Sequence, residues 1–222
     1  MKFFDDKSKQ TTNWNRNYFY LGTLLFVILN ILLFGILGSG WSEKVFDYSA
    51  NYDNFKLLNF FNGLLGSIDH VNWQHVLLNM LCFVIVGIYL ERKYGTLIFL
   101  FLIFYISFFS RMANMLILQH HNRFSHGFSA GNYALYAILL IDYLFSFSKQ
   151  RRNKTNIILG SIVIFAIYLC MCFNGGTSGL GFEFWPYDLI TNSWHWSGFL
   201  TGVLTGLFIE IMRFNFTKIK NT

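Results

Sequence analysis

The stretch Trp73–Leu90, WQHVLLNMLCFVIVGIYL, is an 18-residue run that is apolar apart from three polar side chains near its start. An α-helix of this length and hydropathy is long enough to cross roughly 30 Å of hydrocarbon. Five further runs of the same kind occur in the chain: Tyr18–Leu37, Thr96–Leu118, Ser129–Phe147, Asn156–Phe173 and Trp194–Phe214. We therefore predict an all-α, polytopic membrane protein with six transmembrane helices.

The overall composition agrees with this class. Hydrophobic residues make up 54% of the 222 residues, aromatic residues 20% and charged residues only 13%, which is unlike a soluble globular protein. Because the first run lacks a small-residue cleavage site, we expect it to be retained and not removed as a signal peptide. We expect one membrane domain over residues 18–214, preceded by a cytoplasmic segment, residues 1–17, and followed by a cytoplasmic tail, residues 215–222.

The basic residues are distributed unevenly among the loops. They gather before the first run, after the second, after the fourth and at the C-terminal end, whereas the other loops hold only Lys44, Lys56 and Arg123. By the positive-inside rule, both termini are predicted to be cytoplasmic. The net charge of +6 is thereby explained by orientation in the bilayer, and we expect no nucleic-acid partner. The compact layout without an organellar presequence favours a bacterial plasma membrane.

Two outer loops have opposite characters. The loop over residues 38–72 mixes apolar and polar residues, which predicts short interfacial helices that associate with the membrane. The loop from Gly175 to Gly181 has four glycines in seven residues, which predicts a mobile lid.

Polar groups at membrane depth mark candidate sites, because their burial in lipid is costly. On the second run, the spacing of His75 and Asn79 places both on one helical face, although a simple interhelical hydrogen-bonding pair would look the same. The fourth run opens with Gly127-Phe128-Ser129, where the serine is either a helix N-cap or a nucleophile beside free backbone N–H groups.

The sixth run combines a histidine with a stripe of small residues on one helical face. That face carries His195, Gly198, Gly202 and Gly206, and a similar stripe on the fourth run carries Ala130, Ala134 and Ala137. Small residues of this kind let membrane helices pack backbone to backbone. If the two stripes face each other, His195 is brought close to Ser129.

Together these residues resemble the rhomboid intramembrane proteases over the region from about Phe55 to Gly206. On the second run, the family's histidines, asparagine, Glu-Arg pair and glycine are matched by His70, His75, Asn79, Glu91, Arg92 and Gly95. On the fourth run, its Gly-x-Ser and following aromatic residue are matched by Gly127, Ser129 and Tyr133. On the sixth run, its His-x-x-Gly-x-x-x-Gly pattern is matched by His195, Gly198 and Gly202.

The chain departs from the family pattern at a few positions. Ala130 replaces the glycine that follows the serine, and Phe55-Lys56 stands where the first outer loop of the family usually has Trp-Arg. The third run carries Arg111 and Asn114 where small residues are expected.

The resemblance implies a six-helix rhomboid-like bundle and a serine-type endopeptidase that cuts transmembrane segments of other proteins in the lipid bilayer, without metal or cofactor. It implies Ser129 as nucleophile and His195 as general base, with His75 and Asn79 stabilising the oxyanion. It also implies that Tyr133 stacks on His195. We expect a dyad without a third acid, because Asp142 and Glu210 lie several turns away along their helices.

Three alternatives remain open at this point. A rhomboid-like pseudoprotease would bind transmembrane segments without cleavage, but such proteins lack the serine or the histidine, and both are present here. A transporter or channel would spread ionisable residues through the bilayer, whereas here they gather near one face. A metal site at His120, His121 and His126 would lack cysteine or carboxylate partners in the same loop.

Overall fold

The computed structural model describes residues 20–41, 65–117, 127–149, 154–171, 173–174, 181–182 and 193–220. Within these residues the chain forms six α-helices and one pair of two-residue strands. In chain order the elements are α1 (Leu21–Leu37), α4 (Trp73–Tyr94), α5 (Thr96–Ile117), α6 (Ser129–Lys149), α7 (Lys154–Met171), β1 (Phe173–Asn174), β2 (Gly181–Phe182) and α8 (Ser193–Lys220). The strands pair antiparallel, with Phe173 opposite Phe182.

The predicted helix starts at Trp73, Thr96 and Ser129 are the first residues of α4, α5 and α6. The sixth run, predicted over Trp194–Phe214, agrees with the apolar part of α8, Ser193–Asn215, although the helix itself continues to Lys220. Helices α4 and α6 likewise continue past the predicted ends of their runs, to Tyr94 and Lys149. The fifth run was expected to continue to Phe173, but α7 ends at Met171 and Phe173 pairs in β1.

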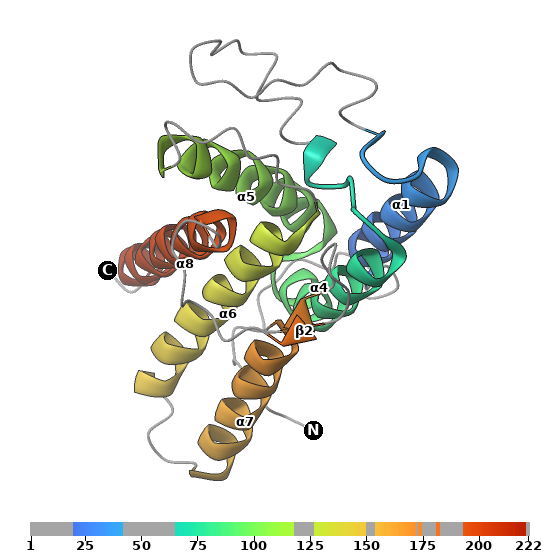
Figure 1. Cartoon of the computed structure of the whole chain (residues 1–222). Coiled ribbons are helices and arrows are strands. Elements are labelled where there is room, and N and C mark those ends of the chain that lie inside the picture. The colour runs from blue at the N-terminus through green and yellow to red at the C-terminus, as the bar shows by residue number, and fades with distance from the viewer. Residues whose placement is uncertain are drawn as a thin grey trace.

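Helix α6 lies in the middle of the bundle, with α8 packed along one side and α4 along the other (Figure 1). It is buried on nearly every face from Ala130 to Leu139, as expected for a helix surrounded by other helices. Helix α5 packs against α8 and α6, while α1 packs mainly against α4. Helix α7 lies at the edge of the bundle beside α6 and α4, so α6 is the element around which the others are organised.

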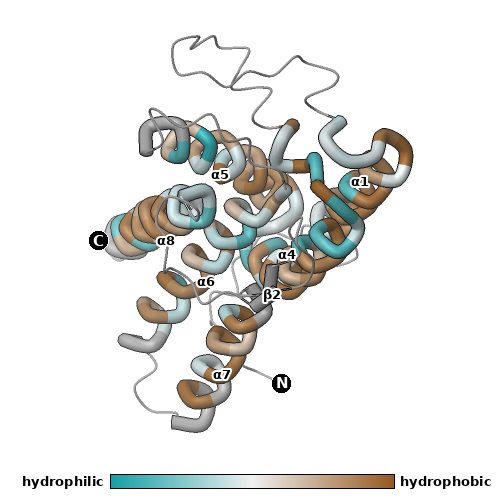
Figure 2. Tube along the Cα trace, in the orientation of Figure 1, coloured by the Kyte–Doolittle hydropathy of each residue, from teal (hydrophilic) through white to brown (hydrophobic). Residues whose placement is uncertain are grey.

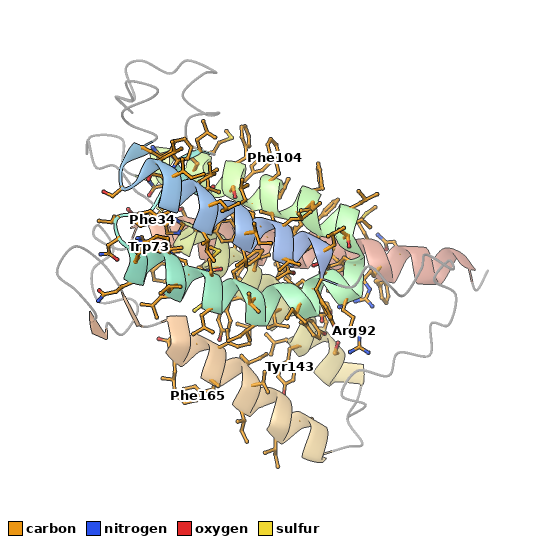
Figure 3. The ribbon with its side chains drawn as sticks, turned by 90° about the vertical axis from the view of Figure 1, so that its right-hand side faces the viewer. Phe34, Trp73, Arg92, Phe104, Tyr143 and Phe165 are labelled. Carbon is orange, nitrogen blue, oxygen red and sulfur yellow. The ribbon has the colours of Figure 1, made fainter. Side chains whose placement is uncertain are left out.

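The helices consist largely of hydrophobic residues along their length (Figure 2), and many large apolar side chains on them are exposed. Phe104 on α5 and Phe165 on α7 project outward and are 53% and 59% exposed (Figure 3). Among the described residues, three helical segments are long and apolar enough to cross a membrane, namely Trp73–Tyr94, Thr96–Asn114 and Ser193–Asn215. Because large apolar side chains face outward instead of filling a core, the surface is matched to lipid and the chain is an integral membrane protein.

Local signals explain where α4 begins and ends. At its start, the side chain of Asn72 accepts a hydrogen bond of 2.8 Å from the backbone N–H of His75, which caps the helix. At its end, Gly95 adopts a left-handed φ of +84° and its N–H donates to the carbonyl of Glu91. This glycine lets the chain turn directly into α5. The start of α4, where Trp73 packs against Phe34 of α1, and its C-terminal end, near Arg92, are therefore both set by local sequence signals (Figure 3).

Glu91, near the C-terminal end of α4, joins three segments of the bundle. Its carboxylate is 2% exposed and accepts hydrogen bonds from the backbone N–H groups of Gly22 and Thr23, both at 2.8 Å. The hydroxyls of Thr23 and Thr96 donate to it as well, at 2.6 and 2.7 Å. The carboxylate thus accepts hydrogen bonds from N–H groups that have no partner within α1, and its negative charge interacts favourably with the positive end of the α1 helix dipole. These bonds hold α1 against α4 and α5.

Glu91→Gln is expected to lower the free energy of unfolding by about 2–4 kcal/mol. The NH₂ group of glutamine would face N–H and O–H donors that now donate to a carboxylate oxygen, so these donors would lose their acceptor. Thermal unfolding in detergent measures the effect. Arg92→Gln is the matched control, since Arg92 is the next residue and is exposed. If the Glu91→Gln protein unfolds at the same temperature as the wild type, this carboxylate does not hold α1 in place.

Candidate functional site

Ser129 is the first residue of α6 and is partly exposed. The chain enters the helix through Gly127, whose φ of +93° lies in the left-handed region that favours glycine. The N–H of Gly127 donates to the carbonyl of Gly66 at 3.1 Å, which ties this entry to the segment just before α4. Ser129 is thereby presented at a helix N-terminus, where backbone N–H groups are available to a developing negative charge.

His75 and Asn79 of α4 lie directly beside Gly127. A Cβ built on Gly127 would lie 2.7 Å from Cε1 of His75 and 3.0 Å from Nδ2 of Asn79. A side chain at this position would therefore collide with both residues. The structure brings the polar pair of α4 against the segment that leads into Ser129, and only a glycine leaves room for that approach.

The small-residue stripes of α6 and α8 face each other, as predicted. A Cβ on Gly198 would lie 2.8 Å from the Cα of Ala130, and a Cβ on Gly202 would lie 2.6 Å from the Cα of Ala134. Real Cβ atoms do not come this close to backbone, so the two helices touch backbone to backbone. Ala130 follows Ser129 and Gly198 lies one turn after His195, so the starts of the two helices lie at the same level.

The aromatic rings of Tyr133 and His195 are stacked. Their centroids are 4.6 Å apart and their planes differ by 28°. The contact expected between these residues is therefore present. Tyr133 lies four residues after Ser129 and shares its helical face, so the stacked imidazole is held on the side of α6 that carries the serine.

The acidic residues of α6 and α8 are engaged elsewhere. Asp142 accepts a hydrogen bond from the hydroxyl of Tyr89 at 2.9 Å and pairs with Lys93 and Arg213. Glu210 pairs with Arg213 at 2.7 Å. Both carboxylates belong to a charged cluster toward the other end of α4, α6 and α8, so neither is placed to orient the imidazole of His195.

The sequence reasoning missed Asn132. This residue is 4% exposed, lies three residues after Ser129, and donates from Nδ2 to the side-chain oxygen of Asn79 at 3.2 Å and to its backbone oxygen at 2.9 Å. A polar side chain in a buried apolar run was the available signal. Arg111, which departs from the expected pattern, is 2% exposed and lies 5.4 Å from the ring centroid of Trp194, at the start of α8.

Metal binding receives no support from the part of the chain that the structure describes. No group of three His, Cys, Asp or Glu residues is arranged there to hold a metal ion. The loop histidines considered for such a site, His120, His121 and His126, lie outside the described residues, as do residues 42–64 and residues 175–180 of the glycine-rich segment.

Comparison with known families gives one match. A family model described as Rhomboid domain matches residues 64–215. The matched region begins just before α4 and covers His75, Asn79, Ser129 and His195. No curated protein matches the chain.

Proposed function

The chain belongs to the rhomboid family of intramembrane proteases, and from that premise we propose that it is an active serine endopeptidase with a dyad of Ser129 and His195. Members of this family act on transmembrane substrates within the membrane. The observation that carries the proposal is the close packing of α6 against α8, which sets the helix starts that bear Ser129 and His195 side by side. Tyr133 supports it, because its ring stacks on the imidazole of the proposed base.

The proposed reaction begins with attack of the Ser129 hydroxyl oxygen on a peptide carbonyl carbon, while His195 takes the hydroxyl proton. The carbonyl oxygen becomes an oxyanion, and we assign His75, Asn79 and the N–H of Ser129 as its hydrogen-bond donors. Among the described residues, Nδ2 of Asn79 has no hydrogen-bond partner, so this donor is available to the oxyanion.

Collapse of this intermediate breaks the C–N bond, and His195 donates its proton to the leaving amine. Water then hydrolyses the acyl group from Ser129, with His195 again acting as base and then as acid. Tyr133 fixes the plane of the imidazole by stacking, a role that a carboxylate plays in a triad. Gly127, Gly198 and Gly202 support the site by allowing the close approaches around it.

In this proposal the six described helices are the six spans of a rhomboid bundle. The membrane domain covers residues 18–214, between a cytoplasmic segment, residues 1–17, and a cytoplasmic tail, residues 215–222. The first outer loop lies at the membrane surface. We assign both termini to the cytoplasm on the positive-inside pattern, propose a bacterial plasma membrane as the location, and take the substrate to be a transmembrane segment of another protein.

The experiment that tests the proposed function is cleavage of a reporter transmembrane protein by the purified chain in liposomes. The expected result is two products whose masses locate the cut in or near the transmembrane segment. A fluorophosphonate probe should label Ser129, because such probes react with activated serines. A wild-type protein that binds reporters, cuts none of them and resists the probe would instead be a pseudoprotease.

A further inference from the structure

Asn132 of α6, three residues after Ser129, makes a side-chain contact with Asn79 of α4. The Asn132 amide donates to the side-chain oxygen of Asn79 and also to its backbone oxygen, at 3.2 and 2.9 Å. Both side chains are buried, at 4% and 6% exposed. The bond to the side-chain oxygen holds the carbonyl end of the Asn79 amide toward α6, and the bond to the backbone oxygen keeps the Asn132 amide at this position.

The other end of the Asn79 amide points toward the proposed site. Its Nδ2 would lie 3.0 Å from a Cβ on Gly127, two residues before Ser129. Since an asparagine amide presents oxygen on one side and NH₂ on the other, a bond that holds the oxygen also decides where the NH₂ points. Asn132 therefore selects the amide orientation in which Asn79 offers a donor to the segment around Ser129.

Packing alone gives a poor reason for an asparagine at position 132. Among the described residues, its Oδ1 has no hydrogen-bond partner although the side chain is buried between helices. A buried acceptor without a partner is costly, so part of the stability that the hydrogen bonds to Asn79 provide is lost again at Oδ1. A buried polar side chain that is only partly satisfied and lies against a proposed site residue is a candidate for a role in that site.

We propose that Asn132 is a positioning residue that orients the Asn79 amide as an oxyanion donor. The inference rests on the proposed function, since it assigns a role within that site. Asn132 does not touch the reacting atoms and acts only through Asn79. Loss of one oxyanion donor typically lowers kcat on the order of a hundredfold. If only the orientation of the Asn79 amide is lost, kcat is expected to fall roughly tenfold, because the released amide still adopts the productive orientation part of the time.

The test compares Asn132→Val with Asn30→Val in liposomes on one reporter substrate. Asn30 is a matched control, because it is a fully buried asparagine on α1 whose Nδ2 donates within its own helix to Phe26 and whose Oδ1 likewise lacks a partner among the described residues. Asn132→Val is expected to lower kcat about tenfold with KM unchanged. Its unfolding temperature is expected to fall slightly, because the buried side-chain oxygen of Asn79 loses its hydrogen-bond partner. Asn30→Val is expected to keep wild-type kcat.

A double-mutant cycle separates positioning from a general structural effect. Asn79→Ala is expected to lower kcat on the order of a hundredfold, and Asn79→Ala/Asn132→Val should be no slower than Asn79→Ala alone. Losses that multiply in the double variant would overturn the inference. Asn132→Ala, which only shortens the side chain, is expected to behave as Asn132→Val does, so the test does not depend on valine fitting between the helices.

The outcomes distinguish this inference from the proposed function. If the wild type cuts the reporter, Ser129→Ala does not, and Asn132→Val and Asn132→Ala both keep wild-type kcat, the inference is overturned and the proposed function stands. If the wild type cuts no reporter, the proposed function is overturned and the role of Asn132 with it.

Discussion

Ser129→Ala is expected to lower the rate of reporter cleavage at least ~10⁴-fold while leaving the fold intact. The loss is large because alanine has no oxygen to form the acyl-enzyme, and the remaining oxyanion donors accelerate only direct attack by water. The fold should persist, since the side chain is partly exposed at the first residue of α6 and alanine is a strong helix former. Cleavage in liposomes and thermal unfolding in detergent measure the two effects.

The matched control for this variant is Ser146→Ala, which makes the same change at a partly exposed position near the other end of α6. It is expected to cut at the wild-type rate. His195→Ala should lose about as much activity as Ser129→Ala, and combining them should add little, because nucleophile and base act as one unit. Cleavage by Ser129→Ala at the wild-type rate would show that another residue is the nucleophile.

Gly202→Ala is expected to lower the free energy of unfolding by about 3 kcal/mol and to reduce cleavage sharply. The added methyl group would lie 2.6 Å from the Cα of Ala134, and backbone cannot move aside as a flexible side chain can. Helices α6 and α8 must then separate. A displacement of about 1 Å between Ser129 and His195 is enough to cost on the order of a hundredfold in rate.

Gly35→Ala is the matched control, because a Cβ there would meet Trp73 at an ordinary contact distance of 3.6 Å. Within α1, alanine should be neutral or stabilise the helix by about 0.5–1 kcal/mol. Gly206→Ala should fall between the two, since its nearest neighbour would be the Cβ of Ile141 at 3.0 Å. Thermal unfolding of all three variants checks this order, and a Gly202→Ala protein as stable as Gly35→Ala would contradict backbone contact between α6 and α8.

Helix starts were predictable because their signals are local. The cap at Asn72 and the glycine turn at Gly95 act within a few residues, and apolar runs begin where the membrane-crossing part of a helix begins. Ends were less predictable. The run ending at Phe214 correctly marks the apolar part of α8 but not the helix, which continues to Lys220 because helix formation does not require lipid.

Parts of the candidate site were also visible in the sequence. The spacing of His75 and Asn79 places them on one face of a helix, and the alanine and glycine stripes indicated which faces of α6 and α8 meet. The stacking of Tyr133 on His195 followed from the family resemblance and is present in the structure. The catalytic roles of these residues stay predictions that the variants above test.

Other contacts were decided only by the folded chain. Asn132 lies 53 residues from Asn79, Glu91 lies 69 residues from Gly22, and Phe173 pairs with Phe182 across a loop. Buried polar groups need hydrogen-bond partners, but the sequence does not show which residue will be the partner of a given group.

The sequence by itself determined the membrane class, the helices and their small-residue faces, because hydropathy and helical periodicity are properties of neighbouring residues. The tertiary structure decided which polar groups meet, because those contacts depend on how α4, α6 and α8 pack against one another.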